Sequence, residues 1–367
     1  MVSKAETLRV LIAGGGTGGH VIPGLAIARE LRGAHGADVQ FAGTARGLET
    51  KLVPEAGFKL HLVRSGQLKN VSLATRMRTA LDLPLGVVEC VGLLREFRPQ
   101  VVVGVGGYAS GPGMLAAILL RVATLAYEPN AVPGMTNRWL GRWVSAAAVN
   151  FAQTASYFRN AEVTGVPVRP EIFELPPRPA GAPPRLLVTA GSNGALIFNE
   201  TMSKIAARLL DAVPGLTIVH QSGARALDAT RAAYAASGAD PARWTVEAFL
   251  TDMPAQYAAT DLVLARAGST VAELCAAGKP SLLVPFAAAA DDHQRKNAGV
   301  LVAAGAAAML LQRDVTPETL LDGLRDLLLD SDRRAEMSAR AKALAHPEAL
   351  ERIAAMVVRL AMPKTDK

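Results

Sequence analysis

Short apolar runs alternate with longer segments of helical periodicity along the whole chain. Strands are expected at Arg9–Ala13, Val39–Ala42, Leu60–Val63, Val101–Val105 and Thr124–Tyr127, and again at Arg185–Thr189, Leu216–His220, Leu262–Ala265 and Ser281–Pro285. Helical patterns fall between them, as at Pro23–Leu31 and Met114–Arg121. Alternation of this kind predicts an α/β fold with parallel sheets and right-handed crossovers.

The length of 367 residues suits two domains of under about 200 residues each. Both halves open with a strand, a small-residue loop and a helix, which predicts two Rossmann-like domains in tandem, 1–168 and 169–345. Five prolines in Glu174–Pro184 indicate a semi-stiff connector. The last helix, within 346–367, carries its apolar residues on one face, and we expect it to pack back onto the first domain.

Composition narrows the class of protein. Aromatic residues make up only 5% of the chain, which favours α/β layers over a β-sandwich. The two cysteines, Cys90 and Cys275, allow no disulfide framework and indicate a reducing compartment. No signal peptide is expected at the start of the chain. The uncharged run Val101–Leu120 is interrupted by glycines and a proline, so we interpret it as strand, loop and helix instead of a membrane span.

The excess of positive over negative charge is confined to the first half of the chain. Residues 1–168 hold 17 Lys and Arg against 10 Asp and Glu, whereas the remaining residues hold 22 of each. Such asymmetry indicates that the first domain meets an anionic partner, which could be a nucleic acid, an acidic lipid surface or a phosphorylated substrate. The chain shows no aromatic-rich platform for RNA, and we expect no nucleic-acid partner.

The first glycine-rich loop carries Gly14, Gly16 and Gly19 between a strand and a helix, the spacing of a phosphate-binding turn. A dinucleotide site also needs an acid at the end of the second strand, and "FAGTARG" has none there. No lysine follows the glycines, which excludes a Walker loop. A role in helix–strand packing alone remains the alternative.

Three further loops have similar character. Gly191–Gly194 also joins a strand to a helix, and Gly268–Thr270 opens a helix that carries Glu273. Two helix starts in one domain suit a diphosphate. A fourth loop, Gly104–Gly113, lies in the basic half. Two phosphate-bearing ligands, one for each domain, favour a transferase over a dehydrogenase.

The chain resembles the MurG family of N-acetylglucosaminyltransferases. The motifs "GGGTGGHVIPGLAIA", "GVGGYASGPG", "YEPNAVPGMTNRWL", "TGVPVR", "AGSNGALIFN", "HQSG" and "PFAAAADDHQRKNA" occur in this order across nearly the whole chain. The resemblance implies a GT-B fold, two Rossmann-like domains facing across a cleft. It also implies inverting transfer of GlcNAc from UDP-GlcNAc to the MurNAc 4-hydroxyl of lipid I (undecaprenyl-diphospho-MurNAc-pentapeptide), giving lipid II for peptidoglycan synthesis, at the cytoplasmic face of the bacterial plasma membrane, with no cofactor and no metal.

The same resemblance implies roles for individual residues. The UDP-GlcNAc ligands would be Thr17, Gly18, Gly19, Asn130, Arg169, Ser192, Leu250, Ser269, Thr270, Glu273 and Gln294. Together with the basic charge of the first half, it assigns the acceptor diphosphate to Gly106, Gly107, Tyr108 and Ser110. Tyr127 stands where the family usually has histidine.

His20 is the candidate catalytic residue. It lies at a helix start, where the positive end of the helix dipole favours a neutral imidazole able to accept a proton. The alternative is that His20 only positions the acceptor. Alternatives also remain for Glu273, as a helix-surface acid, and for Arg169, in an interdomain salt bridge. Trp139 and Trp143, four residues apart, are interpreted as core residues and not as a sugar platform.

An interfacial helix is expected between Arg64 and Arg98, where an apolar ridge is flanked by basic residues. The residues expected to dock on an anionic membrane are Lys69, Leu73, Arg76, Met77, Arg78 and Leu81. A core-facing helix with a solvated basic side is the alternative. Other functions left open are a UDP-GlcNAc epimerase or another GT-B sugar-nucleotide enzyme, an NAD-type oxidoreductase, and a non-catalytic protein that binds membranes or RNA.

Overall fold

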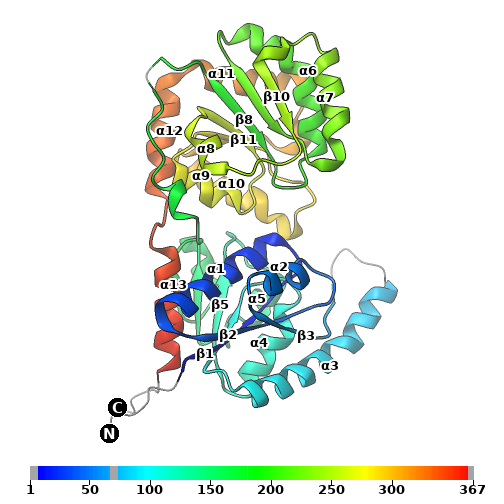
Figure 1. The fold of residues 1–367 in the computed structure, drawn as a ribbon, viewed down its shortest axis with the longest axis vertical. Coiled ribbons are helices and arrows are strands. Elements are labelled where there is room, and N and C mark those ends of the chain that lie inside the picture. Colours follow the sequence, from blue (N-terminus) through cyan, green and yellow to red (C-terminus); the bar gives the residue numbers. More distant parts are fainter. Residues whose placement is uncertain (1–6, 67–72, 180, 363–367) are drawn as a thin grey trace. The chain divides into compact units, whose positions relative to one another are not determined.

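The computed structural model describes residues 7–66, 73–179 and 181–362, apart from the side chains of 73–81. The chain divides into two compact units. Unit 1 comprises Met1–Pro167 together with Glu348–Lys367, and unit 2 comprises Val168–Pro347. Each unit contains one parallel sheet with helices on its faces (Figure 1).

The sheet of unit 1 has the strand order β3-β2-β1-β4-β5-β6-β7, and every neighbouring pair is parallel. The strands are β1 (Arg9–Ala13), β2 (Asp38–Gly43), β3 (Lys59–Leu62), β4 (Val101–Gly104), β5 (Ala123–Glu128), β6 (Ala146–Val149) and β7 (Ala161–Val163). The α-helices are α1 (Gly18–His35), α2 (Glu49–Glu55), α3 (Leu73–Phe97), α4 (Ser110–Leu119), α5 (Met135–Leu140) and α13 (Ala349–Ala361).

Both faces of this sheet are covered. On one face, Leu31 of α1, Val53 of α2 and Val357 of α13 pack with alternate residues of the central strands. On the other, α3 and α4 contribute Leu94 and Met114 to a second cluster. Helix α13 lies against α1 (Figure 1). The amphipathic face of the last helix is therefore buried in unit 1, far along the chain from the strands it covers.

Unit 2 has the strand order β10-β9-β8-β11-β12-β13, again all parallel. Its strands are β8 (Arg185–Thr189), β9 (Thr217–Gln221), β10 (Trp244–Glu247), β11 (Leu262–Ala265), β12 (Ser281–Leu283) and β13 (Ala307–Met309). Its α-helices are α6 (Leu196–Ala212), α7 (Leu227–Ala236), α8 (Met253–Ala258), α9 (Thr270–Ala277), α10 (His293–Ala303), α11 (Pro317–Leu329) and α12 (Ser331–Ala343).

All nine strands expected from the hydrophobic pattern are present, with ends shifted by at most two residues. The pattern missed β6, β7, β10 and β13. Three of these, β7, β10 and β13, are edge strands of three or four residues, and β6, next to an edge, reads Ala-Ala-Ala-Val, so the apolar pattern is short or weak in each. The run Val101–Leu120 does form a strand, a loop and a helix. No described helix combines the length and the apolar character needed to cross a bilayer.

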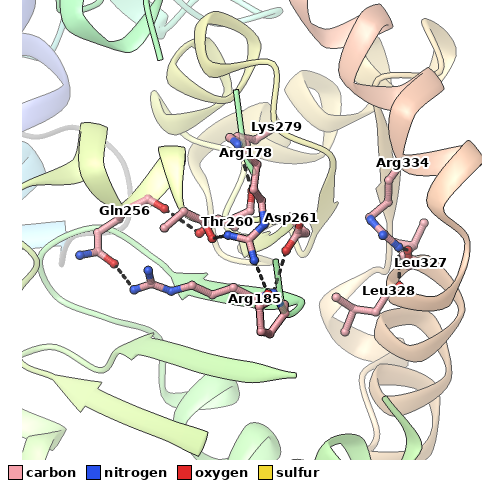
Figure 2. Close-up of polar contacts among 11 residues, drawn as sticks. Arg178, Arg185, Gln256, Thr260, Asp261, Lys279, Leu327, Leu328 and Arg334 are labelled. Atoms are coloured by element: carbon pink, nitrogen blue, oxygen red, sulfur yellow. Dashed lines mark hydrogen bonds and ion pairs between the residues drawn. The ribbon is translucent and has the colours of Figure 1, made fainter. Parts of the chain in front are cut away.

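The proline-rich segment is not the connection between the two units, because it lies inside unit 2. Its residue Arg178 is largely buried and fastens it to the start of the sheet (Figure 2). Arg178 Nε lies 2.8 Å from Asp261 Oδ1, and the guanidinium also donates to the carbonyls of Ala259 and Pro183. The other Asp261 oxygen accepts from the Arg185 amide at 2.8 Å. The chain therefore passes between the units at Pro167 and Pro347 instead.

We expect Arg178→Ala to loosen this edge of unit 2. The change removes the Arg178 guanidinium from Asp261 Oδ1 and from two carbonyls, which should lower the local free energy of opening by about 2–3 kcal/mol. Hydrogen–deuterium exchange of β8 and β11 in the full chain measures this. Arg313→Ala is the control, because that side chain is 80% exposed in its ion pair. Equal exchange in the two variants would contradict the role given to Arg178.

Candidate active site

His20 lies between two glycine-rich loops of unit 1. The first of these loops leaves β1 and leads into α1, whose first turn carries His20. Thr17 directly precedes this turn, and its hydroxyl lies 3.2 Å from His20 Nδ1. The imidazole ring packs against Gly106 and Gly107, where an added Cβ would lie 2.9 Å from Cδ2 and 3.2 Å from Nδ1. Both glycines have positive φ, 91° and 75°. Side chains at these positions would be strained and would displace the imidazole.

The second loop follows β4, the neighbour of β1, so the two loops lie at the same edge of the sheet. The ring of Tyr108 lies over Gly16, within van der Waals distance of an added Cβ at 3.4 Å. The expected acceptor residues Gly106, Gly107 and Tyr108 are thus gathered beside His20. Ser110 is buried, and its hydroxyl donates to the Gly107 carbonyl at 2.9 Å, so in this structure it holds the turn.

Asn130 lies in the loop that follows β5, the next strand along, and the buried Glu128 carboxylate holds this loop. Glu128 accepts hydrogen bonds from the Asn130 amide and side chain (3.1 and 3.0 Å), the Gly134 amide (2.9 Å) and the Asn137 side chain (3.0 Å). Burial raises the pKa of Glu128, and these hydrogen bonds oppose the rise. The loop that carries Asn130 is therefore shaped from within by one acid.

Tyr127, which precedes this acid, is completely buried in the core of unit 1. Its hydroxyl has no hydrogen-bond partner among the described residues, and burial raises its pKa. A buried hydroxyl without a partner costs free energy. Nothing in the structure explains why tyrosine stands where the MurG family usually has histidine.

In unit 2 a single amide side chain joins two loops that carry expected UDP ligands. Gln221 at the end of β9 donates through Nε2 to the Gly191 carbonyl at 2.7 Å and accepts the Leu250 amide through Oε1 at 2.9 Å. Leu250 is buried and Ser192 is exposed. Gln221 therefore joins the loop that follows β8 to the loop that follows β10, across the strand β9 that lies between them.

Glu273 lies in the first turn of α9, where its carboxylate is largely removed from water. The Tyr257 hydroxyl donates to Glu273 Oε2 at 3.0 Å. Burial raises the pKa of Glu273, while the Tyr257 hydrogen bond and the positive charge of Arg169 oppose the rise. An acid on the outer surface of a helix would be solvated. The burial of Glu273 therefore favours the interpretation that it contacts a ligand. The influence of Arg169 on Glu273 lies within unit 2 and needs no interdomain salt bridge.

The remaining expected donor ligands lie at the neighbouring strand ends. Ser269 precedes the first turn of α9 and is exposed, with Thr270 directly after it. Gln294 of α10 accepts the Phe286 amide at 2.9 Å, and its Nε2 faces Gly268. The start of α9 is thus flanked by a side chain from α10. Together with the Gly191 loop, it presents first-turn amides suited to a diphosphate.

Sequence reasoning assigned no role to the side chains that hold these loops, namely Glu49, Glu128, Gln221 and Tyr257. For Glu128 and Gln221 the available signal was a polar residue at the end of an apolar strand, whereas Glu49 and Tyr257 lie on helices and carry no such signal. Of the expected membrane-docking set, Lys69 lies outside the described residues, as do the side chains of the other five, whose backbone belongs to α3. Among the described residues, no three His, Cys, Asp or Glu side chains form a group able to hold a metal ion.

Comparison with known proteins places both units in one enzyme class. Residues 10–149 match the glycosyltransferase family 28 N-terminal domain, and residues 185–353 match its C-terminal domain. The crystal structure of Acinetobacter baumannii MurG superposes with a TM-score of 0.80 at 31% identity, covering 96% of this chain and 99% of that one. A putative UDP-N-acetylglucosamine 2-epimerase from Listeria monocytogenes has a TM-score of 0.67 at 15% identity over 98% of each chain, a likeness of fold alone.

Curated relatives narrow this class further. A protein of Anaeromyxobacter sp. (strain Fw109-5) is 45% identical over 95% of this chain and 92% of its own length, and one of Solibacter usitatus is 41% identical over 96% of each. Both are named UDP-N-acetylglucosamine–N-acetylmuramyl-(pentapeptide) pyrophosphoryl-undecaprenol N-acetylglucosamine transferase. The chain belongs to the glycosyltransferase 28 family and, within it, to the family of these transferases, which confirms the resemblance and the GT-B fold class expected from the motifs.

The raised pKa of Glu273 predicts how UDP binding depends on pH. If the ionised carboxylate accepts ribose hydroxyls, UDP affinity should fall as the pH is lowered, and the fall should begin above pH 4.5, because burial raises the pKa of Glu273 above that ordinary value. Glu273→Gln should bind UDP about 10-fold more weakly and lose that part of the pH dependence. Titration calorimetry measures both.

The UDP phosphates also titrate in this range, so the test is the difference between the two proteins. Glu318→Gln, at an exposed position of unit 2, serves as the matched control. Parallel pH profiles for wild type and Glu273→Gln would remove Glu273 from the UDP site.

Proposed function

We propose that this chain transfers N-acetylglucosamine from UDP-GlcNAc to the MurNAc 4-hydroxyl of lipid I, with inversion at the anomeric carbon, to give lipid II. The observation that carries the proposal is identity of 41–45% with transferases of this name over nearly the full length. The preformed loops of both units support it, because each has glycine turns and helix starts suited to phosphates.

Unit 2 holds the donor in this proposal. The first-turn amides of α9 and the Gly191 loop take the diphosphate, Glu273 accepts the ribose hydroxyls, and the loop at Leu250 lies by the uracil. Arg169, with its charge near Glu273, serves the diphosphate. Gln294 contacts the sugar. Holding the diphosphate also stabilises the negative charge that develops on UDP as it leaves.

Unit 1 holds the acceptor, with the loop at Gly106, Gly107 and Tyr108 on its diphosphate. The 4-hydroxyl oxygen attacks the anomeric carbon of GlcNAc, the bond to UDP breaks, and UDP leaves with the electron pair. His20 accepts the hydroxyl proton. Its ring is held between Thr17 and the two glycines, so it is positioned before the acceptor binds. Asn130, on a loop shaped by Glu128, contacts the transferred sugar.

The transferase and the alternative enzymes differ in what they need to release UDP. A transferase releases UDP when both UDP-GlcNAc and a lipid I analogue are present, whereas an epimerase acts on UDP-GlcNAc alone and an oxidoreductase requires a nicotinamide. Release of UDP in the absence of acceptor, at the rate seen with acceptor, would overturn the proposal.

Variants of His20 distinguish a base from a positioning residue. His20→Ala should lower kcat roughly 10²–10⁴-fold if His20 accepts the proton, with UDP affinity unchanged in calorimetry. A smaller loss, mostly in the acceptor KM, is the result for a residue that only positions the acceptor. Near-normal kcat and KM would remove His20 from both roles.

We also propose that unit 1 docks on an anionic membrane from the cytoplasmic side. The relatives' names include an undecaprenol substrate, and the excess positive charge lies in this half of the chain. Trp139 and Trp143 were expected in the core, and that prediction is wrong, because they are 63% and 68% exposed. Leu119, at the end of the adjacent helix α4, is 64% exposed.

These exposed apolar residues lie in a basic surrounding. Arg142 stands between the two tryptophans in sequence, Arg121 lies two residues after Leu119, and both arginines are exposed. Tryptophan is favoured at the level of lipid headgroups, and each nearby arginine contributes about 1 kcal/mol of attraction to anionic lipids. The helix α3, which contacts α4, carries five of the six docking residues expected from the sequence.

Vesicle sedimentation tests the docking face in two ways. Arg76→Glu with Arg78→Glu should weaken binding to anionic vesicles most clearly at low salt, because the charge term is screened. Trp139→Ser with Trp143→Ser should weaken it at all salt concentrations. Leu329→Ser, which changes an exposed apolar residue of unit 2, is the control. Activity on a short-chain soluble acceptor should survive, and unchanged binding in both double variants would contradict this docking face.

A further inference from the structure

Glu49 is a buried carboxylate that binds the glycine loop from inside unit 1. It is the first residue of α2, and only 1% of its surface is exposed. Oε2 accepts the Gly16 amide at 2.7 Å, and Oε1 accepts the Thr44 amide at 3.0 Å and the Thr44 hydroxyl at 2.8 Å. No described cation forms an ion pair with it. Three hydrogen-bond donors and the start of a helix therefore stabilise this charge.

Three glycines make the space that the carboxylate occupies. An added Cβ at Gly15 or Gly47 would overlap the carboxylate itself, and one at Gly43 would lie 2.8 Å from Glu49 Cγ. These glycines come from the β1 loop, the end of β2 and the turn before α2. The absence of a side chain at these three positions makes room for a carboxylate of the protein itself.

The position of the carboxylate bears on what the loop can bind. In dinucleotide-binding proteins the amides of a loop with this spacing face a phosphate. Here the Gly16 amide is already paired with an anion. The acid absent from the end of the second strand is thus supplied six residues later, and it reaches back to the glycine loop instead of reaching out to a ribose.

We propose that Glu49 is a positioning residue, a built-in anion that holds the glycine loop in its active shape and keeps the Gly16 amide from substrate phosphate. The loop runs directly from Gly16 to Thr17 and His20, whose side chains are 3.2 Å apart, so a shift of the loop displaces the imidazole. This leaves the first-turn amides of α1 for the substrates. The effect on catalysis rests on the proposed function, whereas the occupation of the loop by an anion does not.

Chemical rescue tests the inference in the full-length protein. Glu49→Ala keeps Cβ and removes the methylene and carboxylate, which are the groups that acetate supplies. We expect kcat to fall about 100-fold, as for a misplaced catalytic group, with UDP affinity unchanged. Sodium acetate should restore kcat in a saturable way, more than formate or propionate and more than sodium chloride at equal ionic strength. Glu55→Ala, at an exposed position of the same helix, should show neither the loss nor the rescue.

Thermal unfolding gives a readout that does not depend on the reaction. Acetate should raise the Tm of Glu49→Ala relative to chloride and leave that of wild type unchanged, even if the protein proved to catalyse another reaction. Should the alanine variant not fold, Glu49→Gln fills the space but sets an NH₂ group against a donor, so kcat should fall without rescue by acetate. Normal kcat in a folded Glu49 variant, or an alanine variant that acetate neither stabilises nor restores, would overturn the proposal.

Discussion

The backbone amides and carbonyls of the loops that leave the carboxyl edge of a parallel sheet need hydrogen-bond partners, and the neighbouring strands supply only some of them. In this protein buried side chains supply others. Glu49 pairs with the loop of β1, Glu128 with the loop of β5, and Gln221 with the loops of β8 and β10. Glu49 and Glu128 accept from loop amides, whereas Gln221 donates to the Gly191 carbonyl and accepts the Leu250 amide, and these side chains hold the loops that carry the candidate ligands.

The two buried acids of unit 1 are held in the same way. Each is removed from water and accepts hydrogen bonds from backbone amides and neutral side chains, and neither forms an ion pair with a described cation. Glu273 in unit 2 differs, because it has one neutral donor, Tyr257, and the more distant charge of Arg169. An acid with unused acceptor capacity suits a site that receives hydroxyl donors from a ligand, whereas a fully paired acid suits a structural role.

The periodicity of apolar residues was sufficient to predict the strands at the centre of each sheet. Strands such as β1, β8 and β11 are buried on both faces, so they read as continuous apolar runs bounded by polar residues. The same reasoning failed at β6, which reads Ala-Ala-Ala-Val, and at β10, a four-residue edge strand. It also failed for Trp139 and Trp143, because α5 ends at Leu140 and their spacing of four residues does not place them on one helix face. It also misplaced the function of the proline-rich segment, which depends on the distant partner Asp261.

The sequence by itself determined the fold class, the family and the loops that carry the candidate ligands, because these follow from local pattern and from motifs in a fixed order. Only the tertiary structure decided what holds those loops. Glu49 and Gly16 are 33 positions apart, and Gln221 and Leu250 are 29 apart, so their hydrogen bonds arise from strand order and not from local sequence. An acid beyond a strand looks the same in the sequence whether it faces water, a ribose or its own glycine loop. The choice depends on which neighbouring strand brings a free amide within reach.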